Sequence, residues 1–373
     1  MVLGLFLILQ VAPKIAQALN AGYDKGFYLL SDDEKFKFQI NLRVIPQYQF
    51  EHKEARLDGS TFQFESVQTF FRGHSFSPKV QYTISLEYAD GGASLKDAYV
   101  DLKLSDPFSM QVGQFYLPIN REDYYVDFGH QMITVSIVSE HFGLGRDRGI
   151  SFYGSPPVPL TYYFFFTNGD GENAANKNKE VLVGSRLEYA LMGEITGYQG
   201  DPDYSDKPNL GFGGTILYDF GSAGETDGFD DDIAAGIRPN ENRLVRGDID
   251  GAFTWMGFNL LGQWQFIYNN RFRAVDHGYL VQSGFYVVPH RLEAAGRYAV
   301  VVPDFPTPAL ALTGITSENE GSPNPVHEFA GGLNYYFKGD KLKLQGEYKQ
   351  IINVNGIRNL NDQVIRAQLF LEF

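Results

Sequence analysis

Charged residues that could act on a solute gather in the segment 117–144 and just beyond it. The candidates are Arg121, Glu122, Asp123, Asp127, Arg146, Asp147 and Arg148. Opposite charges that face each other across a narrow opening create a transverse field, which sorts solutes by charge and dipole. Two compatible hypotheses follow. In one, the arginines attract anions while the acids shape the opening; in the other, the same groups form salt bridges that hold the segment against a wall.

Catalytic chemistry finds little support in the sequence. The chain has no cysteine, which excludes disulfides, thiolate metal sites and a cysteine nucleophile. Among the histidines, only His74 stands beside a serine, Ser75. The acidic run 230–232 could hold a divalent cation, but we favour a solvated loop that meets lipopolysaccharide through such a cation. We therefore expect no catalytic residue, no resident metal and no cofactor.

Composition points to a membrane β-barrel. Aromatic residues make up 15% of the 373 residues, and there are 40 glycines. Aromatic girdles and glycines at strand bends are typical of such barrels. The formal net charge of −14 argues against a nucleic-acid partner, because phosphate contacts need clustered lysine and arginine.

The elements that must position the charged residues are alternating strands of about ten residues. In the stretch 36–44, apolar residues occupy every second position, and polar residues, among them Lys37 and Arg43, lie between them. Similar alternation recurs at 80–88 and 342–349. In a soluble sandwich the apolar face would point inward, whereas in a membrane barrel it faces lipid and the polar face lines the lumen. Alternation alone fits both.

The two ends of the sequence favour the membrane barrel. Residues 1–18 have the apolar run and the small-x-small site of a signal peptide, and the run is too short for a membrane helix of about 20 residues. The final stretch, 362–373, alternates and stops on Phe373, and so resembles the last strand of bacterial outer-membrane barrels. We expect it to pair with 35–50, because an open edge in lipid would leave backbone donors unsatisfied.

The sequence therefore predicts an all-β fold, a transmembrane antiparallel β-barrel with short periplasmic turns and long extracellular loops. Counting candidate strands gives 16, with 18 possible, and the ambiguity lies in 221–246. The predicted domains are a signal peptide at 1–18, an N-terminal lead-in at 19–34 and the barrel at 35–373.

Several stretches resemble the phosphate-selective porin O and P family of Gram-negative outer membranes. They are LKDAYVD at 95–101, FGLGRDRG at 142–149, GYLVQSGFYVVP at 278–289 and GGLNYYFK at 331–338. The matches run in order from about Ala21 to Phe373. The resemblance implies a homotrimeric outer-membrane porin, a water-filled channel for passive diffusion of small solutes and ions, including anions such as phosphate. It also implies that 117–144 is the third extracellular loop, folded into the lumen.

The same resemblance implies a ladder of arginines along the pore wall and a lysine cluster at the constriction. By alternation, the wall candidates are Lys37, Arg43, Asp97, Asp101, Lys103, Arg297, Lys343 and Arg366. They are scattered and mixed in sign, and 117–144 holds no lysine. Alternation leaves the direction of Arg72 open. A general porin with modest ion preference therefore fits these residues better than a phosphate channel.

Two other functions stay open. One is an outer-membrane hydrolase, which needs a serine and histidine pair near the rim; the other is a structural or adhesive barrel with a plugged lumen. For a porin in the Gram-negative outer membrane, the expected partners are membrane lipid, lipopolysaccharide, small ions and solutes, and two further copies of the chain. The barrel-assembly machinery is a further expected partner, through the terminal strand ending in Phe373.

Overall fold

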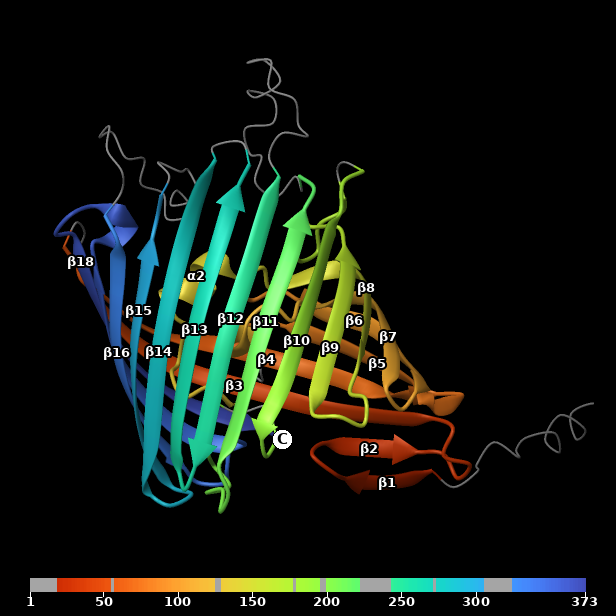
Figure 1. The fold of residues 1–373 in the computed structure, drawn as a ribbon. Helices are drawn as coiled ribbons and strands as arrows, with labels where there is room; N and C mark the ends of the chain where they lie inside the picture. Colours follow the sequence, from red (N-terminus) through yellow and green to blue (C-terminus); the bar gives the residue numbers. More distant parts are fainter. Residues whose placement is uncertain are drawn as a thin grey trace, which may run out of the picture.

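The computed structural model describes residues 19–54, 57–124, 129–176, 179–194, 199–221, 243–270, 273–304 and 324–373. Sixteen strands, β3 to β18, run antiparallel in sequence order, and β18 pairs with β3 to close them into a barrel (Figure 1). These strands are β3 (Lys37–Lys53), β4 (Gly59–Ser75), β5 (Ser77–Glu87), β6 (Ser94–Ser105), β7 (Phe108–Tyr116), β8 (Arg146–Gly154), β9 (Leu160–Thr167), β10 (Leu182–Met192), β11 (Asn209–Asp219), β12 (Leu244–Trp255), β13 (Phe258–Asn269), β14 (Ala274–Val288), β15 (Leu292–Val302), β16 (Val326–Tyr336), β17 (Leu342–Ile352) and β18 (Asn361–Glu372).

The predicted antiparallel barrel is confirmed, with 16 rather than 18 strands in the closed sheet. Two more short strands, β1 (Asn20–Tyr23) and β2 (Phe27–Leu30), form a hairpin in the lead-in, and β2 pairs with the start of β3. The ambiguous stretch contains the start of β12, but 222–242 lie outside the described residues, as does the predicted signal peptide.

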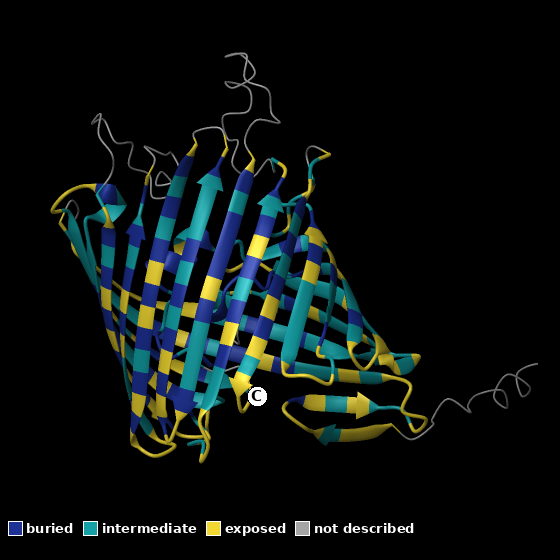
Figure 2. Cartoon of the chain, viewed as in Figure 1, coloured by how far each residue is buried: buried dark blue, intermediate teal, exposed yellow. Residues whose placement is uncertain are grey.

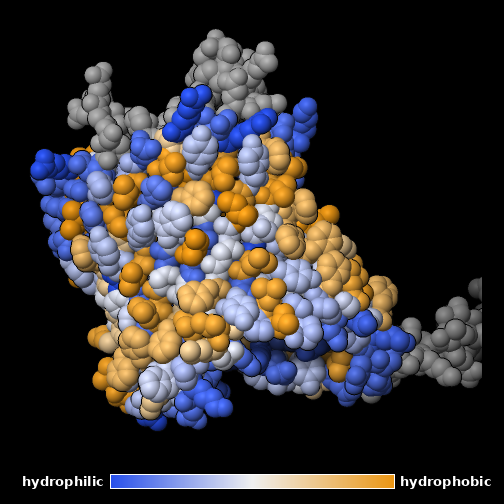
Figure 3. All heavy atoms as spheres, in the orientation of Figure 1, coloured by the Kyte–Doolittle hydropathy of each residue, from blue (hydrophilic) through white to orange (hydrophobic). Residues whose placement is uncertain are grey.

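Alternation along strands such as β16 separates a lipid-facing exterior from a polar lumen. In β16, Phe329 and Leu333 are 47% and 59% exposed, whereas Glu328 and Asn334 are fully buried. Figure 2 shows the same alternation across the wall, and Figure 3 shows apolar side chains over much of the outer surface. In water such exposure would cost about 25 cal/mol for each Å² of apolar surface, so the pattern suits a barrel surrounded by lipid. The apolar faces point outward, which excludes the soluble sandwich.

The terminal strand forms the seam of the barrel, as the sequence predicts. Residues of β18 pair with β3, with Glu372 opposite Arg43. The N–H of Phe373 donates to the carbonyl of Leu42 at 3.0 Å, and the N–H of Leu42 donates to the carbonyl of Phe373 at 2.8 Å. The last residue of the chain therefore satisfies backbone groups that lipid could not.

The connections of the barrel fall on two rims. On the rim at the bottom of Figure 1 most are short turns, such as Met256–Gly257 between β12 and β13. The connection between β10 and β11 departs from the predicted pattern, because it runs from 193 to 208 on this same rim.

Candidate pore constriction

The segment 117–144, which we call the inner segment, connects β7 to β8, and its described residues pack inside the barrel. It contains two short helices, α1 (Arg121–Tyr124) and α2 (Ile137–Phe142). The hydroxyl of Ser136 caps α2 by accepting the N–H of Ser139 at 3.2 Å. No helix in the described parts of the chain is long and apolar enough to cross a membrane.

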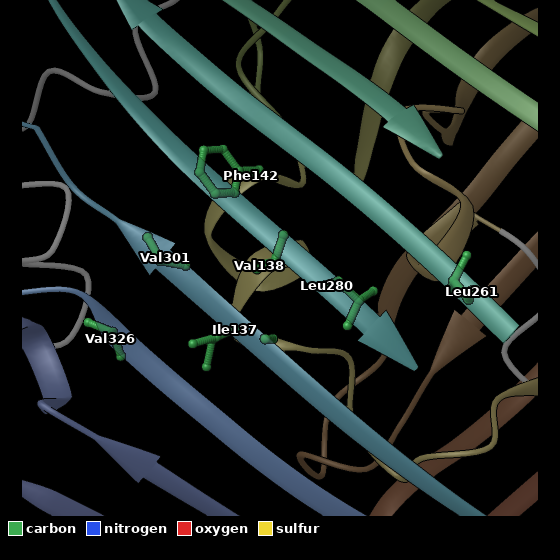
Figure 4. Packing of buried hydrophobic residues seen from close by; sticks show 8 residues of the cluster. Ile137, Val138, Phe142, Leu261, Leu280, Val301 and Val326 are labelled. Carbon is green, nitrogen blue, oxygen red and sulfur yellow. The ribbon is translucent and has the colours of Figure 1, made fainter. Parts of the chain in front are cut away.

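Apolar contacts anchor the inner segment near both of its ends. At α2, Ile137, Val138 and Phe142 pack on side chains from β13 to β16 (Figure 4). Before α1, Leu117 and Ile119 pack with Phe115 on the wall formed by β9, β10 and β11. The wall side chains of the two clusters are Leu261, Leu280, Ala299, Val301 and Val326, and Phe165, Leu182 and Leu217. Each fully buried side chain of this kind contributes about 1.5–3 kcal/mol, so both ends are firmly held.

Arg121 lies in a buried ion-pair network against the wall. Its Nε is 2.6 Å from Asp250 Oδ1, and its Nη2 is 3.8 Å from Glu188 Oε1. Arg186 of β10 forms ion pairs with the same two carboxylates: its Nη2 lies 2.5 Å from Asp250 Oδ2 and 2.8 Å from Glu188 Oε1. Its Nη1 lies 3.2 Å from Asp248 Oδ1. These side chains are at most 6% exposed. This geometry is the one the salt-bridge hypothesis expects of Arg121.

Glu122 and Arg297 form a second buried hub. Arg297 Nη1 donates to Glu122 Oε1 at 3.0 Å, and Arg297 Nε donates to Glu328 Oε1 at 2.6 Å. Glu122 also accepts the N–H and hydroxyl of Ser136, at 2.9 and 2.5 Å. Lys349 completes the hub, 3.3 Å from Glu328. The charges are therefore compensated in place, as burial requires.

Polar side chains of β16 and β17 hold the middle of the inner segment, and Asn334 of β16 donates to the carbonyl of Gln131 at 2.9 Å. The carbonyl of His130 accepts from Lys343 Nζ at 3.1 Å and from Gln345 Nε2 at 3.2 Å. Glu347 accepts the N–H of Ile133 at 2.8 Å and is paired with Arg366 at 3.1 Å. Three of the predicted wall residues, Arg297, Lys343 and Arg366, thus lie on the side of the lumen that the inner segment covers.

The remaining side of the lumen holds an open cavity of about 230 Å³. Its wall residues come from β3, β4, β5, β6, β8, β17 and β18, and His130, Met132 and Ile133 of the inner segment face them. The charged members of the lining are Arg43, Glu65, Glu87, Lys96 and Arg146. This cavity is the candidate constriction, with mixed charges around one opening.

The cations of the cavity each meet a carboxylate. Arg43 Nη2 is 2.9 Å from Glu372 Oε2, and Arg146 Nε is 2.8 Å from Asp97 Oδ1. Lys96 Nζ is 2.9 Å from Glu172 Oε1. Arg72, whose direction alternation left open, stacks its guanidinium 4.4 Å above the ring of Phe70. The opening therefore carries paired charges rather than a row of free cations.

The other predicted residues that the structure describes lie outside the cavity lining. Asp147 accepts the N–H groups of Arg148 and Gly169 at 2.7 and 2.5 Å, and Arg148 Nε donates to Gln114 at 3.2 Å. Lys103 is 3.3 Å from Asp101, which also accepts the hydroxyl of Tyr153. The N–H of Asp123 donates to Asn120 at 2.8 Å, and Lys37 Nζ lies 5.2 Å from the Tyr28 ring centre. Asp127 lies outside the described residues.

Sequence reasoning missed several lining residues. Glu87 lies on the polar face of an alternating stretch and could have been found by period. Lys96 could not have been found by period, because the register between β5 and β6 shifts beside it. Ile84 pairs with Ala98, whereas Leu86, two residues on, pairs with Leu95, three residues back. Two consecutive residues, Lys96 and Asp97, therefore lie opposite one residue of β5, and such a β-bulge redirects side chains that strict alternation would place elsewhere.

Neither a His74–Ser75 pair nor a metal-binding group forms in the described part of the chain. His74 Nε2 lies 2.8 Å from the carbonyl of Glu34 and not beside the hydroxyl of Ser75. No group of three or more histidine and carboxylate side chains converges on a point among the described residues. The acidic run 230–232 lies outside them.

The fold is that of outer-membrane porins. No protein-family model matches the sequence, and no curated protein matches it. Among solved structures, OprB of Pseudomonas putida is similar with a TM-score of 0.62 and 10% identity, over 94% of this chain and 95% of that one. OmpF of Salmonella typhi, in complex with daunomycin, has a TM-score of 0.61 and 12% identity, over 95% and 100%. An anion-selective porin from Comamonas acidovorans has a TM-score of 0.58 and 10% identity, over 91% and 100%.

Proposed function

We propose that this chain is a porin of the Gram-negative outer membrane, which passes small solutes and ions passively through a water-filled lumen. The observation that carries the proposal is the open, charge-lined cavity between the inner segment and the wall formed by β3 to β6, β8, β17 and β18. A closed barrel with an apolar exterior places that cavity inside a membrane. Its lining then decides which solutes cross.

The charges of the constriction favour general diffusion over phosphate selectivity. Arg43, Lys96 and Arg146 are each compensated by a carboxylate within 2.9 Å. Paired charges across an opening produce a transverse field but little net potential along it. The more specific alternative is selective passage of phosphate, which the resemblance to the porin O and P family implies.

The partners follow from the same proposal. The exposed apolar side chains of the outer wall face lipid, and lipopolysaccharide meets the upper rim. Homotrimer assembly and recognition of the strand ending in Phe373 by the barrel-assembly machinery belong to the proposal as well, and both come from the resemblance.

Liposome swelling combined with zero-current potentials tests this function. Folded protein in liposomes should admit small uncharged sugars, at rates that fall with solute size, whereas protein-free liposomes should not swell. In a KCl gradient the zero-current potential should lie near zero. A strongly anion-selective potential with competition by phosphate would replace general diffusion by the phosphate alternative, and absence of swelling would reject the porin.

A further inference from the structure

Part of the connection between β10 and β11, described from residue 199 onward, reaches into the lumen from the rim of short turns. Residues 199–206 of this connection, which we call the strut, contact the inner segment on one side and neighbouring turns on the other. A connection on this rim needs only about two to five residues to join antiparallel strands. The extra length of 193–208 is therefore available for another purpose.

Gln199 links the tip of the strut to the inner segment through its backbone and its side chain. Its N–H donates to the carbonyl of Gly129 at 3.3 Å, and its Nε2 donates to the carbonyl of Glu122 at 3.1 Å. Its Oε1 accepts the N–H of Gln131 at 3.1 Å and Nε2 of Gln282 at 2.9 Å. One side chain thus joins two parts of the inner segment to β14.

Gly200 lies where a larger residue has no room. A Cβ at this position would lie 2.6 Å from Glu293 Oε1. Glu293 is fixed in turn, because it accepts from Gln131 Nε2 at 2.5 Å, Asn334 Nδ2 at 3.0 Å and Tyr336 Oη at 2.6 Å. The strut is therefore closely fitted to the wall as well as to the inner segment.

Asp201 fastens the base of the strut to the rim. Its carboxylate accepts the N–H of Ser205 at 3.0 Å, the hydroxyl of Ser205 at 2.6 Å and the N–H of Gly257 at 2.8 Å. The carbonyl of Pro202 lies 2.8 Å from His290 Nδ1 in the turn between β14 and β15. Contacts with two turns of the rim thus hold the strut, and with it Gln199, in place.

The residues that Gln199 holds alternate with residues that line the cavity. Gln199 binds Gly129 and Gln131, while His130 and Met132 face the opening. The geometry points to the strut as a positioning element that braces the inner segment from the periplasmic side and so sets the width and steadiness of the pore. This inference rests on the proposed porin function.

Single-channel recording of strut variants tests the role. Gln199→Ala removes both side-chain contacts to the inner segment, and Gly200→Val forces the strut away from Glu293. Because pore current follows the narrowest cross-section, we expect roughly 1.5-fold or larger open-channel current and more sub-states for both variants. Gln199→Glu, which keeps the acceptor toward Gln131 but loses the donor toward Glu122, should be intermediate.

Matched controls are Gln81→Ala and Gly331→Ala. Among the described residues, the side chain of Gln81 donates only to the carbonyl of Pro78, and a Cβ on Gly331 would meet no atom within 4 Å. Both should conduct as wild type. If the Gln199 variants and folded Gly200→Val show wild-type current and noise, the positioning role of the strut is wrong. If the wild-type protein itself passes no current, the proposed porin function is wrong. If Gly200→Val does not fold, the graded series Gln199→Glu and Gln199→Ala decides alone.

Discussion

Replacing Arg297 by methionine should detach the inner segment while leaving the barrel closed. Arg297 makes four hydrogen bonds, of which one goes to Glu328 on the wall and three go to the inner segment. Those three acceptors are Glu122 at 3.0 Å, the carbonyl of Thr134 at 2.8 Å and the carbonyl of Val135 at 3.3 Å. Methionine fills a similar volume but leaves two carboxylates buried without this cation.

The expected size of the effect follows from burial. Arg297, Glu122 and Glu328 have side chains at most 1% exposed. Breaking a buried ion pair of this kind costs about 3–5 kcal/mol. Since about 1.4 kcal/mol is a factor of ten, the balance between docked and undocked inner segment should shift by roughly a hundredfold or more. The barrel ladder does not involve this side chain and should persist.

Two assays on the Arg297→Met variant check the reasoning. Single channels should show larger and noisier current than wild type, and the circular dichroism of the folded barrel should keep its strand content. Lys103→Met is the control, because the Lys103 side chain contacts Asp101 and Tyr153 on the barrel wall; its channels should stay quiet. Quiet, wild-type channels from Arg297→Met would refute a role for this hub in holding the inner segment.

Three further predictions follow from the site and the rims. Arg146→Ala should shift the zero-current potential toward cations because it frees Asp97 at the cavity, whereas Arg121→Ala should increase channel noise without that shift; equal shifts would contradict this placement. Burial raises the pKa of Asp340, in the turn after β16, to about 6 from an ordinary 3.8. The folded form therefore binds this proton more tightly than the unfolded form, so the free energy of unfolding should fall by about 2–3 kcal/mol between pH 4 and 6 and then level off. Asp340→Asn should remove that decrease, and a variant with the wild-type pH profile would contradict the assignment to Asp340. Deleting Phe373 should slow barrel insertion into lipid vesicles, since its backbone closes the seam; unaltered insertion rates would oppose this role.

Much of the fold could be predicted because alternation is a local property. In stretches such as 36–44 and 362–373 the alternation of apolar and polar residues predicts which side faces lipid. Closure of the barrel follows because an open strand edge in lipid would leave backbone groups unsatisfied. The number of strands was harder, because 221–246 lacks a clear alternating pattern. Sixteen emerged only from the pairing of strands in space.

The candidate site was less accessible to sequence reasoning. The sequence predicts that 117–144 enters the lumen, but it does not show which of the charges would face the opening. Arg121 and Arg146 carry the same charge and differ only in the partners that the fold gives them. Lys96 depends on a β-bulge, and Gln199 is an uncharged residue whose contacts come from segments about 70 and 80 positions away. Such hydrogen bonds are decided by tertiary structure and leave no periodic signal.

The most direct measurement is the current through single molecules of the purified, folded protein in a planar lipid bilayer. We predict steady, ohmic steps of uniform size, with a zero-current potential near zero in a KCl gradient. A folded barrel that inserts and yet passes no current would contradict the porin and favour a structural or adhesive barrel with a plugged lumen.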